Sequence, residues 1–294
     1  MKQVAFLSRH PLSRILLACA CLAIAGTGWS QADIERSEHW AYASFFGTGW
    51  YNINEDRSVF VLKTTPRWKV GEAGFDDAGK RNVAWIYRVP MTFGLSHFDF
   101  DDVPGIIDPD NLSTATLAFG MDVDIPITRQ FSIRPLAELG YGRVLGEPDS
   151  AWTYKAAVRS RYSFRHEKLD WALLAGLGYV GYTPDEGRSD DFTYAEIAAE
   201  FGYPVDWFGK TDSQAMFYWS LGYTEFIDEI DFSQGLPGVE SIANYWQVGV
   251  AVGKRDTPVR IWFLNFDRLG VAYNYGNTGQ LRGIRFVFRS LYEI

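Results

Sequence analysis

The sequence predicts an all-β protein, a single closed antiparallel transmembrane β-barrel of about 12 strands. Three observations favour this class. Apolar and polar residues alternate at period two, the alternating segments are longer than is usual in soluble sheets, and the apolar parity is rich in aromatic residues. The clearest segments, 112–127, 169–180 and 244–253, show no helical periodicity.

Composition limits the function classes. The chain has 294 residues, 16% of them aromatic, and a formal net charge of −8. This apolar and aromatic content excludes a disordered chain. We expect no nucleic-acid partner, because an acidic protein lacks the attraction to phosphate on which such binding depends. The mean hydropathy of −0.14 is compatible with a membrane barrel, whose strands alternate polar and apolar residues.

Residues 1–32 resemble a cleaved secretory signal peptide. Three basic residues lie before or at the start of the apolar run 15–26, and a small-x-small site ends at Ala32, so cleavage is expected before Asp33. An uncleaved membrane anchor is the alternative, which the shortness of the apolar run disfavours.

Both cysteines, Cys19 and Cys21, lie within this signal. A lipoprotein is therefore a second alternative, although the bulky Leu17 is unfavourable before Cys19. Without residues 1–32 the protein has 294 − 32 = 262 residues and no cysteine, so disulfides and thiolate metal sites are not expected. We expect no cofactor and no metal site.

The body of the chain, 33–294, is expected to form one barrel domain. Many of its alternating segments exceed the ~9–11 residues with which a tilted strand crosses a bilayer, and bacterial barrels use an even number of strands. The predicted strands are 39–50, 58–69, 82–98, 112–127, 131–145, 151–165, 169–182, 192–204, 215–227, 241–253, 259–275 and 280–294.

Aromatic residues of the apolar parity lie at or near the strand ends, as in the headgroup zone of membrane barrels. A soluble β-sandwich whose core uses the same aromatics is the alternative. The residues concerned are Trp85, Tyr87, Trp152, Tyr154, Tyr162, Trp171, Tyr179, Trp219 and Tyr223.

The connections predict two rims of different charge. The loops after odd strands hold 17 acidic and two basic residues, whereas the opposite turns hold seven of each. We therefore expect acidic extracellular loops. Five carboxylates in the loop 99–111 allow a Ca²⁺ site as an alternative, but their spacing does not fit the EF-hand pattern, and solvated charge is the favoured interpretation.

The C-terminal segment 281–294 alternates aromatic and apolar residues up to Ile294. It resembles the C-terminal strand by which bacterial outer-membrane barrels are recognised for assembly, although Ile294 replaces the usual Phe and Ser290 interrupts the apolar row. The whole body resembles the translocator barrels of autotransporters, particularly the solitary, barrel-only kind. Only 33–39 precede the first predicted strand, too few for a passenger or a helix through the lumen.

The resemblance implies a Gram-negative outer-membrane protein, exported through the inner membrane and autotransporter-like without a passenger. It implies three partners: outer-membrane lipid, lipopolysaccharide, and the barrel-assembly machinery, which would bind the C-terminal strand. A structural or surface-interaction role is the function expected.

Charged residues fall on the inward parity, because Arg or Lys facing hydrocarbon near the midplane costs ~2–4 kcal/mol. Two interpretations remain open: a small, porin-like diffusion channel with a charge-lined lumen, and a closed lumen filled by a structural network. Inward Gly176, Gly178, Gly249 and Gly253 leave space for long side chains. The predicted lumen-lining residues are Arg88, Asp122, Asp124, Arg134, Glu138, Lys155, Arg159, Arg161, Arg165, Glu196, Glu200, Arg285 and Arg289.

An enzyme is not expected, and no catalytic residue is predicted. A rim hydrolase using His97 is the least favoured alternative, because the adjacent Ser96 points to the opposite face of a strand. His39 and His166 are expected at the inner rim.

Overall fold

The computed structural model describes residues 45–53, 57–96, 112–145, 148–186, 189–205, 215–230, 242–255, 259–261, 264–277 and 281–291. The predicted signal peptide, His39, His97 and the acidic loop 99–111 lie outside these ranges, as does most of the loop 228–240. In the part of the chain that is described, no helix has the length and apolar character needed to cross a membrane.

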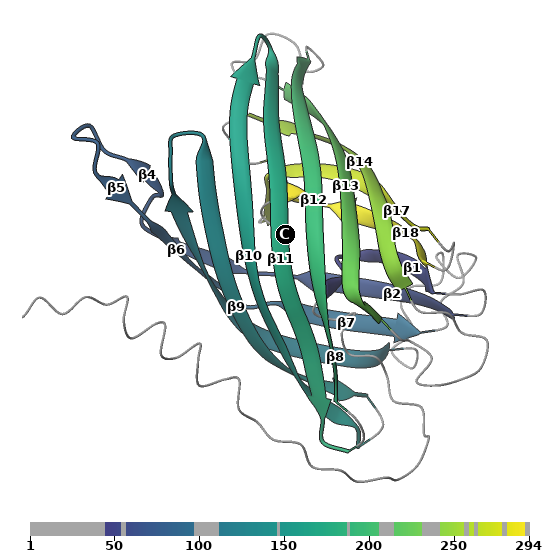
Figure 1. Cartoon of the computed structure of the whole chain (residues 1–294). Coiled ribbons are helices and arrows are strands. Elements are labelled where there is room, and N and C mark those ends of the chain that lie inside the picture. The colour runs from purple at the N-terminus through teal and green to yellow at the C-terminus, as the bar shows by residue number, and fades with distance from the viewer. Residues whose placement is uncertain are drawn as a thin grey trace, which may run out of the picture. The chain divides into compact units, whose positions relative to one another are not determined.

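The described strands form a closed antiparallel barrel with twelve positions in its wall (Figure 1). Successive wall strands pair with each other, and the wall closes where the first strand pairs with the last, with Trp50 opposite Ile284. The strands are β1 (Gly49–Ile53), β2 (Arg57–Thr64), β7 (Met91–Ser96), β8 (Leu112–Pro126), β9 (Phe131–Val144), β10 (Ser150–His166), β11 (Leu169–Pro184), β12 (Asp190–Val205), β13 (Ala215–Ile230), β14 (Ile242–Lys254), β17 (Arg268–Gly276) and β18 (Leu281–Val287).

Two predicted strands are each broken at a proline. Pro66 separates β2 from β3 (Arg67–Val70), and Pro90 separates β6 (Ala84–Arg88) from β7. Proline has no amide hydrogen to donate to a strand ladder, so pairing is interrupted there. β6 and β7 both pair with β8, so together they occupy one position of the wall. The short hairpin β4 (Gly74–Phe75) and β5 (Arg81–Asn82) lies beyond β6 (Figure 1).

Three predicted strands differ in extent from the structure. The first was expected over 39–50, but β1 begins at Gly49, and Phe45 and Phe46 before it pack in the barrel interior. The segment 259–275 contains the separate hairpin β15 (Val259–Ile261) and β16 (Leu264–Phe266) before β17. The last strand ends at Val287, and the following residues include Ser290, which is buried.

The strands have two different faces. Along β9 and β10 buried and exposed residues alternate, which gives each strand one inward and one outward side. Large apolar side chains are exposed on the outward side, over an extent that a water-soluble monomer rarely presents. They include Leu117, Phe119, Leu139, Tyr141, Trp152, Val158, Leu173, Leu177, Ile197, Trp219, Leu221, Trp246, Val248, Val271, Tyr273 and Ile284.

The barrel interior as the candidate functional site

An aromatic and aliphatic cluster fills the interior at one end of the barrel. Its members lie at the ends of the strands that lead into the loops 146–150, 183–191 and 228–240, the end predicted to be extracellular. Nine described strands contribute to it, and each member is at most 8% exposed. We call this cluster the aromatic plug: Phe46, Tyr51, Val61, Val144, Ala151, Val180, Tyr182, Phe192, Tyr194, Phe226, Ile242, Tyr245 and Leu281.

Phe45 packs against the aromatic plug from the segment that precedes β1. Its ring lies edge-to-face with five others, with centroid distances of 5.0 Å to Tyr194, 5.3 Å to Phe226 and 5.7 Å to Phe192. Edge-to-face pairs at such distances are favourable beyond the area that they bury. Phe45 and Phe46 therefore pack in the interior rather than extending the wall.

Two ion pairs span the wall inside the barrel, farther from this end. Arg88 Nη2 lies 2.7 Å from Glu138 Oε2, and its Nε lies 3.5 Å from Asp122 Oδ1. Arg159 Nε lies 2.8 Å from Glu196 Oε1. Arg88, Glu138 and Asp122 are almost fully buried, so their charges depend on one another for compensation.

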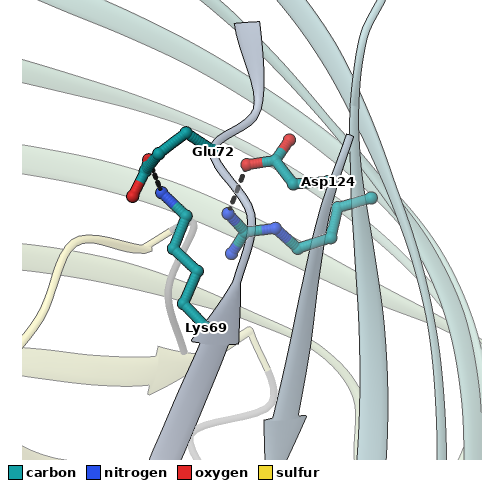
Figure 2. A network of polar contacts seen from close by, with 4 residues as sticks. Lys69, Glu72 and Asp124 are labelled. Carbon is teal, nitrogen blue, oxygen red and sulfur yellow. Dashed lines mark hydrogen bonds and ion pairs between the residues drawn. The ribbon is translucent and has the colours of Figure 1, made fainter. Parts of the chain in front are cut away.

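Further ion pairs lie farther along the interior. Arg134 Nη2 is 2.9 Å from Asp124 Oδ2 (Figure 2). Arg268 Nη1 is 2.7 Å from Glu200 Oε2, and the same carboxylate oxygen accepts a hydrogen bond from the backbone N–H of Leu291. The residues after β18 are thereby attached to β12, which lies four wall positions away in the sheet order.

A cavity of about 550 Å³ lies beside the pairs Arg88–Glu138 and Arg159–Glu196. Phe45 and Tyr245 lie at one side of it, and residues 64–67 and 285–289 form other parts of its lining. The charged residues on the lining are Lys63, Arg67, Arg88, Glu138, Lys155, Arg159, Glu196, Arg285 and Arg289.

Seven of the predicted lumen-lining residues line the cavity: Arg88, Glu138, Lys155, Arg159, Glu196, Arg285 and Arg289. Asp122 reaches Arg88, and Asp124, Arg134 and Glu200 belong to other interior ion pairs. Arg161 is partly buried. Arg165 is apart from the others: its side chain is 58% exposed at the end of β10, where it pairs with Asp170.

Several interior residues were not identified from the sequence. Lys63, Gln247 and Phe45 line the cavity, and Tyr194 and Tyr245 belong to the aromatic plug. The inward parity of the strands carried a signal for the two tyrosines, because Tyr194 shares the parity of Glu196. Phe45 gave no such signal, since it lies inside a segment that alternates like a strand.

The described residues show neither a hydrolase site at the barrel rim nor a metal site. His166 ends β10 and is exposed. His97, the residue considered for a rim hydrolase, lies outside the described ranges, as do the carboxylates considered for Ca²⁺. Within those ranges, no group of three or more His, Asp or Glu side chains is arranged to hold a metal ion.

No protein-family model and no curated protein matches the chain. Solved structures that it resembles include the β domain of the Bordetella autotransporter BrkA, with 9% identity, a TM-score of 0.48, and coverage of 81% of this chain and 92% of that one. The translocator domain of NalP from Neisseria meningitidis has 11% identity and a TM-score of 0.48, and the match covers 80% of this chain and 82% of that one. The transport unit of AIDA-I from Escherichia coli has 11% identity and a TM-score of 0.40, and the match covers 82% of this chain and 88% of that one.

These three are autotransporter barrels, the class that the sequence resembles. Because all three TM-scores are below 0.5, the fold assignment of this chain rests on its own strand pairing.

Proposed function

We propose that this chain is an integral outer-membrane barrel with a closed lumen and a structural or surface-interaction role. The observation that carries the proposal is the aromatic plug, because it fills the interior at one end with tightly packed apolar side chains. An aqueous pathway would have to pass through this cluster. Hydrated ions do not cross a dry apolar layer without a large desolvation cost.

The outward face supports the membrane part of the proposal. Along β10 the exposed wall carries Trp152 and Tyr154 toward one end and Tyr162 toward the other, with the apolar Val158 between them. Aromatic residues at two levels with an aliphatic band between them are typical of membrane barrels, which place their rings at the lipid headgroups. Cell fractionation that recovers the protein in the soluble periplasm would contradict this part.

Single-channel conductance of the refolded protein in a planar bilayer tests the closed lumen. Folding is first verified by the shifted migration of the unheated protein on a gel. We expect no stepwise current from the folded protein. Regular current steps from the same material would overturn the closed-lumen proposal.

The cavity of about 550 Å³ favours one second candidate, a small diffusion channel with a charge-lined lumen. Under this candidate, current steps would be seen, and their ion selectivity would change in an Arg159→Glu/Arg161→Glu variant. Unchanged selectivity in that variant would place any conduction outside the cavity.

The partners are also part of the proposal. The outward face suits outer-membrane lipid and lipopolysaccharide. The C-terminal segment suits the barrel-assembly machinery, because Ile284 and Phe286 of β18 and Phe288 directly after it keep an aromatic and apolar row. Replacing Phe286 and Phe288 together by Ser is expected to lower the amount of assembled protein in the outer membrane. Phe119→Ser, on the outward face of β8, is the matched control.

A further inference from the structure

The charge of the cavity lining is strongly unbalanced. Among the described residues, seven basic side chains and two carboxylates line it, a formal difference of 7 − 2 = 5 positive charges. Asp122 does not line the cavity but pairs with Arg88, and its negative charge offsets one of these five positive charges. The basic residues come from separate parts of the chain: Lys63, Arg67, Arg88, Lys155, Arg159, Arg285 and Arg289.

The two carboxylates are already engaged. Glu138 pairs with Arg88 at 2.7 Å, and Glu196 pairs with Arg159 at 2.8 Å. Lys155 is only 8% exposed, and its ammonium lies 5.8 Å from the ring centroids of both Phe45 and Tyr194. Contact with aromatic faces compensates a buried ammonium only partly, because a buried charge requires an opposite charge or strong hydrogen bonds.

Gln247 is a second, independent indication of a ligand. It lies on the cavity lining, its residue is 7% exposed, and its Nε2 has no hydrogen-bond partner among the described residues. Buried amide groups are nearly always hydrogen-bonded, so a donor left without a partner on a cavity wall calls for an acceptor inside the cavity.

We propose that this cavity binds a small organic anion that carries a carboxylate or phosphate group on a compact apolar body. Lys155, Arg285 and the Gln247 amide would hold the anionic oxygens, since ammonium and guanidinium groups form the strongest hydrogen bonds to such groups. Phe45 and Tyr245, on the same lining, would contact the apolar body. The volume lies within the range of ~300–1,000 Å³ usual for small-molecule sites.

Isothermal titration calorimetry of the full chain, refolded in a neutral detergent at low ionic strength without phosphate buffer, tests the proposal. The probes are phenyl phosphate, benzoate and benzamidine, each added after refolding and, in a second series, present during refolding. We expect the two anions to bind and the cation benzamidine not to bind. If only one anion binds, the result identifies the head group.

Variants locate the site. Lys155→Gln, Arg285→Gln and Gln247→Leu each remove one group that faces the anion, and loss of a charged partner is expected to weaken binding about tenfold or more. Arg143→Gln is the matched control, because Arg143 is exposed on the outward parity of β9. Gln247→Leu keeps the charge unchanged, so it serves if a charge variant does not fold.

Two results would overturn the proposal. The first is the absence of binding by both anions to protein that migrates as folded on an unheated gel. The second is binding that all three interior variants leave unchanged, or that Arg143→Gln weakens equally, since the anion would then bind the outer surface or the detergent.

Discussion

Arg159 on β10 reaches Glu196 on β12 across the intervening strand β11, because Gly176 stands between them. The register places Gly176 opposite Arg159 on one side and opposite Glu196 on the other. The same arrangement recurs where Arg88 on β6 reaches Glu138 on β9 across β8, with Gly120 between them. Both interior ion pairs thus depend on a glycine of the strand that lies between their two partners.

The first prediction concerns these glycines. A Cβ at position 176 would lie 2.6 Å from Oε1 of Glu196, so Gly176→Ala is expected to displace that carboxylate and break its pair with Arg159. We expect the free energy of unfolding to fall by about 1–3 kcal/mol, the usual cost of overpacking. The measurement is denaturant unfolding of the protein inserted in lipid vesicles.

Gly222→Ala is the matched control for Gly176→Ala. Gly222 also faces inward and is buried, but the nearest atom to a Cβ there is 3.6 Å away, which is ordinary contact. We expect its stability to stay close to that of the parent protein. Equal losses in the two variants would show that the effect comes from strand glycines in general and not from the ion pair.

The second prediction concerns the buried pair of Arg88 and Glu138. Arg88→Gln leaves Glu138 buried without its partner and is expected to cost about 3–5 kcal/mol of stability. Glu138→Gln is expected to cost less, because Arg88 keeps its longer contact with Asp122. The double variant is expected to cost less than the sum of the two. A double-mutant cycle measures this coupling.

The exposed pair of Lys69 and Glu72 is the control for that cycle. Figure 2 shows this pair. Its side chains are 45% and 85% exposed, so its coupling is expected to be about 0–1 kcal/mol. If the coupling between Arg88 and Glu138 were equally small, the interior pair would be solvated, which would favour the diffusion channel.

Most of the wall was predictable from the sequence. Alternation at period two located β8 to β14 within a few residues, because a membrane barrel imposes the same two environments on every strand. Alternation was misleading at Phe45, since a segment can alternate without having a partner strand. The breaks at Pro66 and Pro90 were readable in principle, as proline marks points where a ladder is interrupted.

The interior was predictable only in part. The alternation of the strands placed the charged residues Arg88, Glu138, Arg159 and Glu196 on the inner face of the wall. Alternation alone does not predict which of these charges form ion pairs with each other. Pairing across a third strand depends on register, and a shift of two residues would preserve every parity while changing every partner. The aromatic plug, likewise, required knowing that residues distant in the chain share one level of the barrel.

The third prediction concerns closure of the lumen. Phe45 packs against the rings of Tyr194, Phe226 and Phe192, so a Phe45→Ala/Phe226→Ala variant is expected to leave a void at the centre of the aromatic plug. Deletion of the buried Phe226 side chain is expected to cost up to about 3–5 kcal/mol, and deletion of the partly buried Phe45 side chain less. In planar bilayers, we expect current steps from this variant where the parent protein is silent.

Phe119→Ala is the control for the closure test, because Phe119 is exposed on the outward face of β8. It removes the same side chain without opening the interior, so no current is expected. Folded Phe45→Ala/Phe226→Ala protein that stays silent would show that a second barrier closes the barrel, for which the residues after β18 are the nearest candidate.

The fourth prediction tests which solvent surrounds the wall. Val158 is 50% exposed on β10, midway between the outward Tyr154 and Tyr162. In a bilayer, Val158→Arg places a charge in hydrocarbon and is expected to cost about 2–4 kcal/mol of the free energy of unfolding.

Thr183→Arg, on the exposed face at the end of β11, is the control and is expected to cost about 0–1 kcal/mol, because a charge near the interface remains hydrated. Unfolding of both variants in lipid vesicles measures the difference. Equal and small costs would mean that the wall faces water, which would remove the basis of the membrane proposal.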